Sequence, residues 1–183
     1  ENKNVFNSIV DLIENFKNYF VSHNQTVYEN PSPGNKAGGI TTLEEKSLGC
    51  IQKGGSAMIT GVIPYGGHCK NKGLNLLTGP GNDIVSTTNL TAAGAHMILF
   101  TTGRGTPLGA PVPTVKISSN SVLYDRKRNW IDFNAGDLIQ TASFEDKTDE
   151  LLNYIIEVAS GRQTRNEING YSEIAVFKDG VTM

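Results

Sequence analysis

The chain has 183 residues, with 16 basic and 18 acidic side chains and a formal net charge of −2. This balance offers no positive surface for nucleic acid or for an anionic membrane, so neither is expected as a partner. No run reaches the roughly 20 apolar residues of a membrane span, and the first residues lack a basic segment leading into an apolar one, so a soluble, cytoplasmic protein is expected.

The length suits one α/β domain with a sizeable core, and we expect a single domain over residues 1–183. Cys50 and Cys69 have neither the spacing of a metal finger nor the pattern of a disulfide framework, which favours a reducing compartment. The chain begins without methionine, inside a predicted helix that no earlier element precedes. We therefore expect a fragment of a longer polypeptide.

Four segments have helical patterns. Apolar residues recur at intervals of three and four from Val5 to Phe20, and Thr42 followed by Glu45 is a capping-box pattern. A third segment follows Pro80-Gly81, and a fourth ends at a glycine. The predicted helices cover roughly residues 3–22, 42–53, 82–93 and 151–160.

Short runs rich in apolar and β-branched residues lie between and after these helices. Strands that alternate with helices are typical of a mainly parallel sheet with helices on both faces. The fold class predicted is α/β, a Rossmann-like variant in the broad sense. The predicted strands are 58–63, 74–77, 96–100, 114–117, 130–133 and 174–177.

Small polar loops follow four of the predicted strands, at 78–83, 101–107, 118–120 and 134–137. In a doubly wound sheet such loops converge at the carboxyl edge of the strands, where ligands bind. The sequence therefore predicts a site for a hydroxylated, charged small molecule at this edge.

The segment 101–107, Thr-Thr-Gly-Arg-Gly-Thr-Pro, has the residues of an anion-recognition loop. Its two glycines let a ligand approach the main chain, its threonines offer hydroxyls, and the Arg104 guanidinium suits a carboxylate or a phosphate. Leu108 stands where a dinucleotide fingerprint needs its third glycine, and no Walker A motif is present. The alternative interpretation is a turn in which Arg104 caps a helix.

A second anion-binding site is expected at the N-terminus of the helix that starts at Thr41-Thr42, where the 30–39 loop presents Asn35. The alternative for this loop is an exposed connector. Glu45 and Lys46 lie in the first turn of that helix, where capping alone favours glutamate. A carboxylate beside a lysine is also what α-proton abstraction or divalent-metal binding requires.

Asp83, at the start of the third helix, has the same two interpretations, N-terminal capping or contact with a ligand or metal. The motifs of α/β-hydrolases, zinc metalloproteases and Cys-x-x-Cys redox proteins are absent from the sequence. Hydrolase and zinc-enzyme functions therefore have little support.

Several longer motifs together resemble the carboxyl-terminal region of the altronate/galactarate dehydratase family, over nearly the whole chain from Asn30 onward. The Gly-Asn-Asp motif and the Gly-Val-Thr-Met ending are more similar to altronate dehydratases than to galactarate dehydratases. Sulfolactate sulfo-lyase subunits share the same framework. The motifs that carry the resemblance are Asn30–Gly49, Gly73–Leu77, Gly81–Asp83, Phe100–Pro107, Trp130–Gly136 and Ile174–Met183.

The resemblance implies a sugar-acid hydro-lyase, in which a proton leaves the carbon next to a carboxylate and a β-hydroxyl leaves as water. The product is a 2-keto-3-deoxy acid. Family members depend on a divalent metal, which implies Fe2+ first and Mn2+ as the alternative. They also have an amino-terminal domain and a middle dimerisation region, so a homo-oligomer is expected at full length, and a fragment without these parts can be inactive.

Under this resemblance Arg104 and the neighbouring amides suit a carboxylate clamp, and Glu45 suits the base or a metal ligand. Lys46 and Lys116 suit charge stabilisation or hydroxyl departure. The central hypothesis is that Arg104 and Glu45 face one small acid across a few ångströms; the competing hypothesis is a noncatalytic anion-binding or assembly domain. We assign catalysis to Glu45, Lys46 and Arg104, metal binding to Glu45, and substrate binding to Asn35, Thr41, Thr42, Asn82, Asp83, Thr101, Thr102, Gly103, Gly105, Thr106 and Lys116.

Overall fold

The computed structural model describes residues 2–26, 31–140 and 142–180. These residues form two compact units, the first from Glu1–Pro80 with Lys178–Met183 and the second from Gly81–Phe177. Each unit is described by itself. The single domain expected over residues 1–183 remains a prediction.

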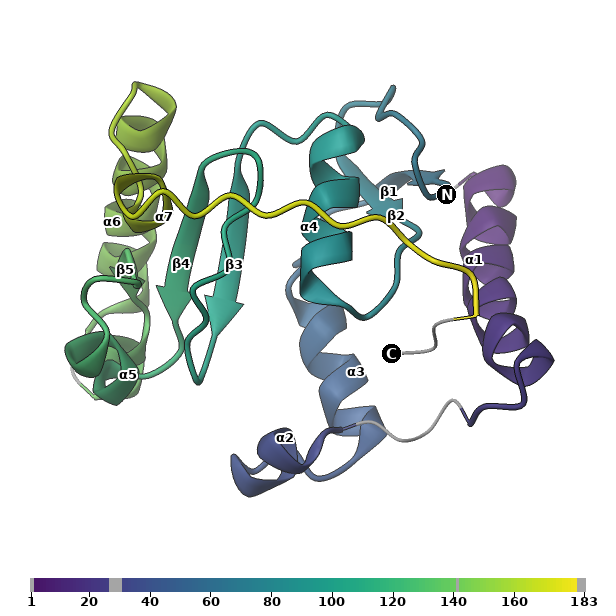
Figure 1. The fold of residues 1–183 in the computed structure, drawn as a ribbon, viewed down its shortest axis with the longest axis horizontal. Helices are drawn as coiled ribbons and strands as arrows, with labels where there is room; N and C mark the ends of the chain where they lie inside the picture. The colour runs from purple at the N-terminus through teal and green to yellow at the C-terminus, as the bar shows by residue number, and fades with distance from the viewer. Residues whose placement is uncertain (1, 27–30, 141, 181–183) are drawn as a thin grey trace. The chain divides into compact units, whose positions relative to one another are not determined.

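The first unit combines helices with a small parallel sheet (Figure 1). Strand β1 pairs with β2 in parallel, and α1 packs against β1. The end of the unit returns to α1, where the Gly180 N–H donates to the Tyr19 hydroxyl at 2.9 Å. The elements are α1 (Lys3–Ser22), α2 (Pro33–Ala37), α3 (Leu43–Gln52), β1 (Ile59–Ile63) and β2 (Leu74–Leu77).

The second unit contains a parallel sheet of three strands in the order β3-β4-β5. The central strand, β4, is buried along its whole length, and α6 lies alongside β4 and β5 (Figure 1). The elements are α4 (Asp83–Ala92), β3 (Ile98–Thr102), β4 (Thr114–Ser118), α5 (Ser121–Arg126), β5 (Phe133–Asn134), the 3-10 helix η1 (Gly136–Ile139), α6 (Phe144–Ala159) and α7 (Arg165–Ile168).

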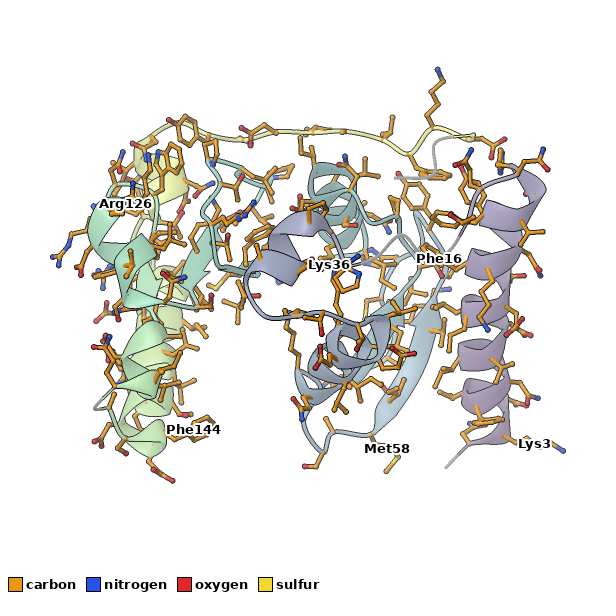
Figure 2. The ribbon with its side chains drawn as sticks, turned by 90° about the horizontal axis from the view of Figure 1, so that it is seen from below. Lys3, Phe16, Lys36, Met58, Arg126 and Phe144 are labelled. Carbon is orange, nitrogen blue, oxygen red and sulfur yellow. The ribbon has the colours of Figure 1, made fainter. Side chains whose placement is uncertain are left out.

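The core of the second unit lies between this sheet and α6. Val115 and Ile117 of β4 pack with Phe133 of β5 and Val158 of α6, and all four are buried. Burial of each such side chain contributes about 1.5–3 kcal/mol. By contrast, Phe144 at the first turn of α6 is exposed (Figure 2). The core therefore fixes the sheet and the C-terminal half of α6, and the sheet carries the polar loops.

The predicted helices and the parallel pairing are confirmed, with α1, α3 and α4 at the expected places, whereas α6 begins at Phe144, well before the predicted start at 151. The strands form two sheets, however, where the sequence led us to expect one. The short helices α2, α5 and α7 and the 3-10 helix η1 were not predicted, because each is held by local caps and turns with little periodicity to reveal it. None of the helices in the described part of the chain combines the length and apolar character that a membrane crossing needs.

The strand predicted at 174–177 is wrong. This segment has no ladder partner, and Ile174 and Val176 are 70% and 75% exposed. It is tied down at single points, among them a bond from the Ala175 N–H to the Thr88 hydroxyl at 3.1 Å. The strand predicted at 130–133 begins only at Phe133, because a turn occupies the residues before it.

Candidate functional site

Three of the predicted polar loops meet at the carboxyl edge of the β3-β4-β5 sheet. The Asn120 side chain donates to the Gly103 carbonyl at 2.9 Å, and the Ser119 N–H donates to the Thr102 carbonyl at 3.0 Å. The Gly105 N–H donates to the Thr102 hydroxyl at 2.9 Å, with Gly105 at a φ of +83° that favours glycine. The loop after β5 joins them, because the Ala135 N–H donates to the Ser118 carbonyl at 2.9 Å. The expected convergence is therefore confirmed for the loops after β3, β4 and β5.

Arg104 is at the exposed tip of this arrangement. Its guanidinium makes no hydrogen bond or ion pair with the part of the chain that the structure describes, so it does not cap a helix there. Thr101 and Gly103 beside it are exposed as well, and Thr102 is half-buried. This loop leaves a guanidinium ready for an anion, with its backbone already ordered.

A cavity of about 330 Å³ lies beside this loop, at the beginning of α4. It brings together Asn82, Asp83 and Thr106, three residues predicted to bind substrate. Asn82 caps α4 by accepting from the N–H groups of residues 84 and 85, which leaves Asp83 in the first helical turn without a capping role. The cavity is lined by Asn82, Asp83, Ile84, Thr106, Pro107, Leu108 and Glu173.

Glu173 is the charged lining residue that was not predicted; the apolar lining residues Ile84, Pro107 and Leu108 were not predicted either. Glu173 lies far from the other lining residues along the chain and directly precedes the apolar run taken for a strand. No local pattern marked Glu173 as a site residue, because a single glutamate ahead of an apolar run is common next to a strand. Its carboxylate accepts a hydrogen bond from the Gly109 N–H at 2.6 Å.

Lys116 lies behind the cavity rather than in it. Its side chain is fully buried, and its ammonium donates to the Thr106 carbonyl at 2.6 Å. Burial lowers the pKa of Lys116 to about 8, and the Asp132 and Glu173 carboxylates offset part of that fall. In this arrangement Lys116 holds the loop that carries Thr106, and direct substrate contact by its ammonium remains a prediction.

Asp132 ties three elements of the second unit together. Its carboxylate accepts from the Lys116 N–H at 2.8 Å, the Tyr154 hydroxyl at 2.9 Å and the Arg165 N–H at 2.8 Å. Burial, together with the Asp132 charge, raises the pKa of Tyr154. All of these donors belong to the protein itself. Asp132 therefore stabilises the fold around Lys116.

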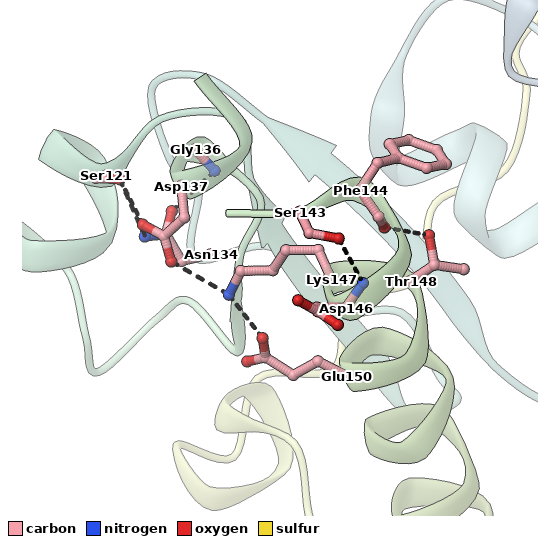
Figure 3. A network of polar contacts seen from close by, with 10 residues as sticks. All are labelled: Ser121, Asn134, Gly136, Asp137, Ser143, Phe144, Asp146, Lys147, Thr148 and Glu150. Carbon is pink, nitrogen blue, oxygen red and sulfur yellow. Dashed lines mark hydrogen bonds and ion pairs between the residues drawn. The ribbon is translucent and has the colours of Figure 1, made fainter. Parts of the chain in front are cut away.

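A second polar network lies where the loop after β5 meets α6 (Figure 3). Asp137 accepts from Asn134 at 2.6 Å and from the Ser121 hydroxyl at 2.9 Å, and its carboxylate lies 3.1 Å from the Lys147 ammonium. The hydrogen bond from Lys147 is the largest of the effects that lower the pKa of Asp137. Lys147 is also 2.7 Å from Glu150.

These groups border a cavity of about 410 Å³. The bonds from Asn134, Ser121 and Lys147 to Asp137 anchor α6 to the loop after β5.

The predicted residues of the first unit form a cluster of their own at the start of α3. The Glu45 carboxylate accepts from the Thr41 N–H at 2.9 Å, the Thr41 hydroxyl at 3.0 Å and the Thr42 N–H at 3.2 Å, completing a capping box. The hydrogen bond from the Thr41 backbone is the largest of the effects that lower the pKa of Glu45. The Lys46 ammonium donates to the Asn35 side chain at 3.1 Å.

The structure thus gathers Asn35, Thr41, Thr42, Glu45 and Lys46 in one unit and the remaining predicted residues in the other. The facing of Arg104 and Glu45 stays a prediction. Within the described ranges no group of three or more His, Cys, Asp or Glu side chains could hold an ion, and metal binding by Glu45 stays a prediction. The Glu45 carboxylate accepts hydrogen bonds from the backbone at the start of its own helix.

The fold and these loops define an α/β unit with an anion-suited edge and a hydroxyl-lined and carboxylate-lined cavity. Residues 1–182 match the family described as D-galactarate/Altronate dehydratase, C-terminal, and the chain belongs to this family.

The chain is 55% identical to an altronate dehydratase of Escherichia coli (strain K12), over 97% of this chain and 36% of that protein. It is 56% identical to an altronate dehydratase of Bacillus subtilis (strain 168), over 100% of this chain and 37% of the relative. A galactarate dehydratase (L-threo-forming) of Escherichia coli (strain K12) is 34% identical, over 96% of this chain and 34% of its own length. The chain therefore spans little more than a third of the length of these relatives.

Proposed function

We propose that this chain is the carboxyl-terminal region of an altronate-type dehydratase, and that its second unit binds the sugar acid. The observation that carries the proposal is the identity of 55% and 56% to two altronate dehydratases over 97% and 100% of the chain. The gathering of Asn82, Asp83 and Thr106 around one cavity supports a polyhydroxylated ligand, because these side chains exchange hydrogen bonds with hydroxyls.

The reaction in this proposal is an elimination. A base takes the proton from the carbon next to the carboxylate, and the electron pair forms the enediolate. The β carbon–oxygen bond then breaks, and the hydroxyl leaves with a proton as water. The resulting enol tautomerises to the 2-keto-3-deoxy acid.

Stabilising the enediolate requires a cation at the carboxylate, and Arg104 is suited to that role. Its guanidinium is exposed and presents paired N–H donors, which match the two oxygens of a carboxylate. The buried ammonium of Lys116 keeps the following residues of the loop in place through the Thr106 carbonyl. The second unit thus supplies the clamp for the reacting carboxylate.

Glu45, with Lys46 beside it, is our candidate for the base and belongs to the first unit. The bonds from Thr41 and Thr42 that lower the pKa of Glu45 also make its carboxylate a weaker base. A substrate that displaces these bonds would restore its basicity.

Several features of the proposal come from the family resemblance. A divalent metal, iron before manganese, is one of them; the described residues offer no ligand set for it, and none of the steps above depends on it. Assembly as a homo-oligomer at full length and a cytoplasmic location are the others.

The test is an activity panel on the full-length polypeptide that contains this chain, with and without added ferrous iron under reducing conditions. Altronate, galactarate and sulfolactate are offered in turn, and 2-keto-3-deoxy acid or sulfite release is measured. The proposal expects altronate to be the best substrate. Turnover of none of the three, with sugar acid still bound, would favour the noncatalytic binding domain.

A further inference from the structure

Glu173 is held at the cavity wall by two bonds to one residue. Its carboxylate accepts from the Gly109 N–H at 2.6 Å, and its own N–H donates to the Gly109 carbonyl at 2.7 Å. The close packing of the chain around residue 109 requires glycine, because a Cβ there would lie 2.2 Å from the Tyr171 carbonyl oxygen. The carboxylate of Glu173 is therefore fixed in place rather than left to move in solvent.

Among the described residues, the cavity has acidic side chains and no cationic ones. Asp83 and Glu173 are the two lining residues with a carboxylate. The buried Lys116 ammonium interacts with the Glu173 charge, but it donates to the Thr106 carbonyl and has no exposed surface for a ligand. A ligand carboxylate placed in this cavity would meet two like charges, whereas a ligand hydroxyl would meet two acceptors.

The sugar acids in the names of the relatives differ in the group at the end opposite to the reacting carboxylate. Altronate has one carboxylate and ends in a hydroxymethyl group, whereas galactarate has a carboxylate at both ends. On the proposed function, Arg104 takes the reacting carboxylate, so the other end of the substrate determines whether it suits an acidic cavity. A hydroxymethyl end suits it, and a second carboxylate does not.

We infer that Asp83 and Glu173 bind the uncharged, hydroxyl-bearing end of the substrate, and that Glu173 is a specificity-determining residue which disfavours sugar acids with two carboxylates. This inference rests on the proposed function. It adds a role for a residue outside the predicted site and states which end of the substrate enters the cavity.

The test is Glu173→Gln in the full-length enzyme, with kcat/KM measured for altronate and for galactarate. The glutamine carbonyl can still accept from the Gly109 N–H, so the anchor is retained while the charge is lost. We expect the altronate-to-galactarate ratio of kcat/KM to fall at least about 10-fold, which corresponds to one strong contact with the distal end of the substrate.

The matched control is Glu167→Gln. The Glu167 carboxylate also accepts from a backbone N–H, that of Thr164 at 2.8 Å, but it does not line the cavity. Its ratio is expected to stay at the wild-type value. If Glu173→Gln does not fold, as judged by its melting temperature, Asp83→Asn takes its place, because Asn82 and not Asp83 caps α4.

An unchanged ratio in whichever of these two variants folds would overturn the inference, provided that the wild type converts altronate. A wild type that converts neither acid would instead count against the proposed function. If the altronate-to-galactarate ratio of kcat/KM falls in Glu167→Gln as well as in Glu173→Gln, the effect reflects a general loss of structure. That result would overturn the specific role of Glu173.

Discussion

Replacing Lys116 by methionine tests whether a charged ammonium is buried beneath the loop at 101–107. Lys116 is fully buried, and its pKa falls from the ordinary 10.5 to about 8 because burial penalises the charged form. The ammonium donates to the Thr106 carbonyl at 2.6 Å. Methionine keeps much of the length of the side chain and removes both the charge and the donor.

The two pKa values fix the sign and the size of the pH effect. Between about pH 8 and pH 10.5 the unfolded chain holds the Lys116 proton and the folded chain does not, so the free energy of unfolding rises with pH. At pH 7 the buried charge costs about 3 kcal/mol, and at pH 9.5 about 1 kcal/mol remains. The wild type should therefore gain about 2 kcal/mol over this interval through Lys116 alone.

The assay is urea unfolding at pH 7 and pH 9.5, followed by the fluorescence of Trp130, the one tryptophan in the sequence and part of the second unit. Groups other than Lys116 titrate alike in wild type and variant, so the difference between the two proteins isolates this lysine. The control is Lys127→Met, the loss of an exposed lysine. Because the Lys127 ammonium lies 4.3 Å from the Trp130 ring centre, unfolding midpoints rather than intensities are compared.

At each pH we take the free energy of unfolding of the wild type minus that of Lys116→Met. This difference is expected to be about 2 kcal/mol more favourable to the wild type at pH 9.5 than at pH 7. The difference between wild type and Lys127→Met should not change. A difference between wild type and Lys116→Met that is equal at both pH values would refute the reasoning, because it would mean that Lys116 has the same pKa in the folded and the unfolded chain.

Three further substitutions test other parts of the second unit. Asn82→Ala removes the side-chain acceptor that caps α4 and should lower the free energy of unfolding by about 1 kcal/mol, measured in urea; no loss would contradict the capping role. Gly136→Ala would place a Cβ 2.3 Å from the Ser121 nitrogen and should cost about 2 kcal/mol or more by the same measurement, whereas a neutral effect would show that the loop after β5 has room. Arg104→Ala should lower kcat/KM for altronate at least about 100-fold in the full-length enzyme without changing the melting temperature, and unchanged kinetics would remove Arg104 from the site.

The parts of the fold with strong periodicity could be predicted from the sequence. The apolar spacing of α1 and the Thr42-Glu45 capping box placed two helices correctly, since both signals are local. The segment 174–177 shows the limit of such signals. Its apolar and β-branched residues suit a strand, but whether a strand forms depends on a partner with an open edge, and the described structure supplies none there.

The candidate site was predicted only in part, for a similar reason. Thr106 and Asp83 were chosen because a loop after a strand and a helix start are marked in the sequence, and the structure brings them to one cavity. Glu173 was missed because its place depends on Gly109, 64 residues away. Substrate contact by Lys116 stays a prediction; its burial and its bond to the Thr106 carbonyl could not be predicted, since a sequence does not show which loop packs over the central strand.

The most direct test of this account is a structure of the full-length enzyme with a non-reacting altronate analogue bound. We predict that the analogue carboxylate lies at Arg104 and that its hydroxymethyl end lies in the cavity lined by Asp83 and Glu173. An analogue bound with its carboxylate in that cavity, or bound away from both Arg104 and the start of α4, would contradict it.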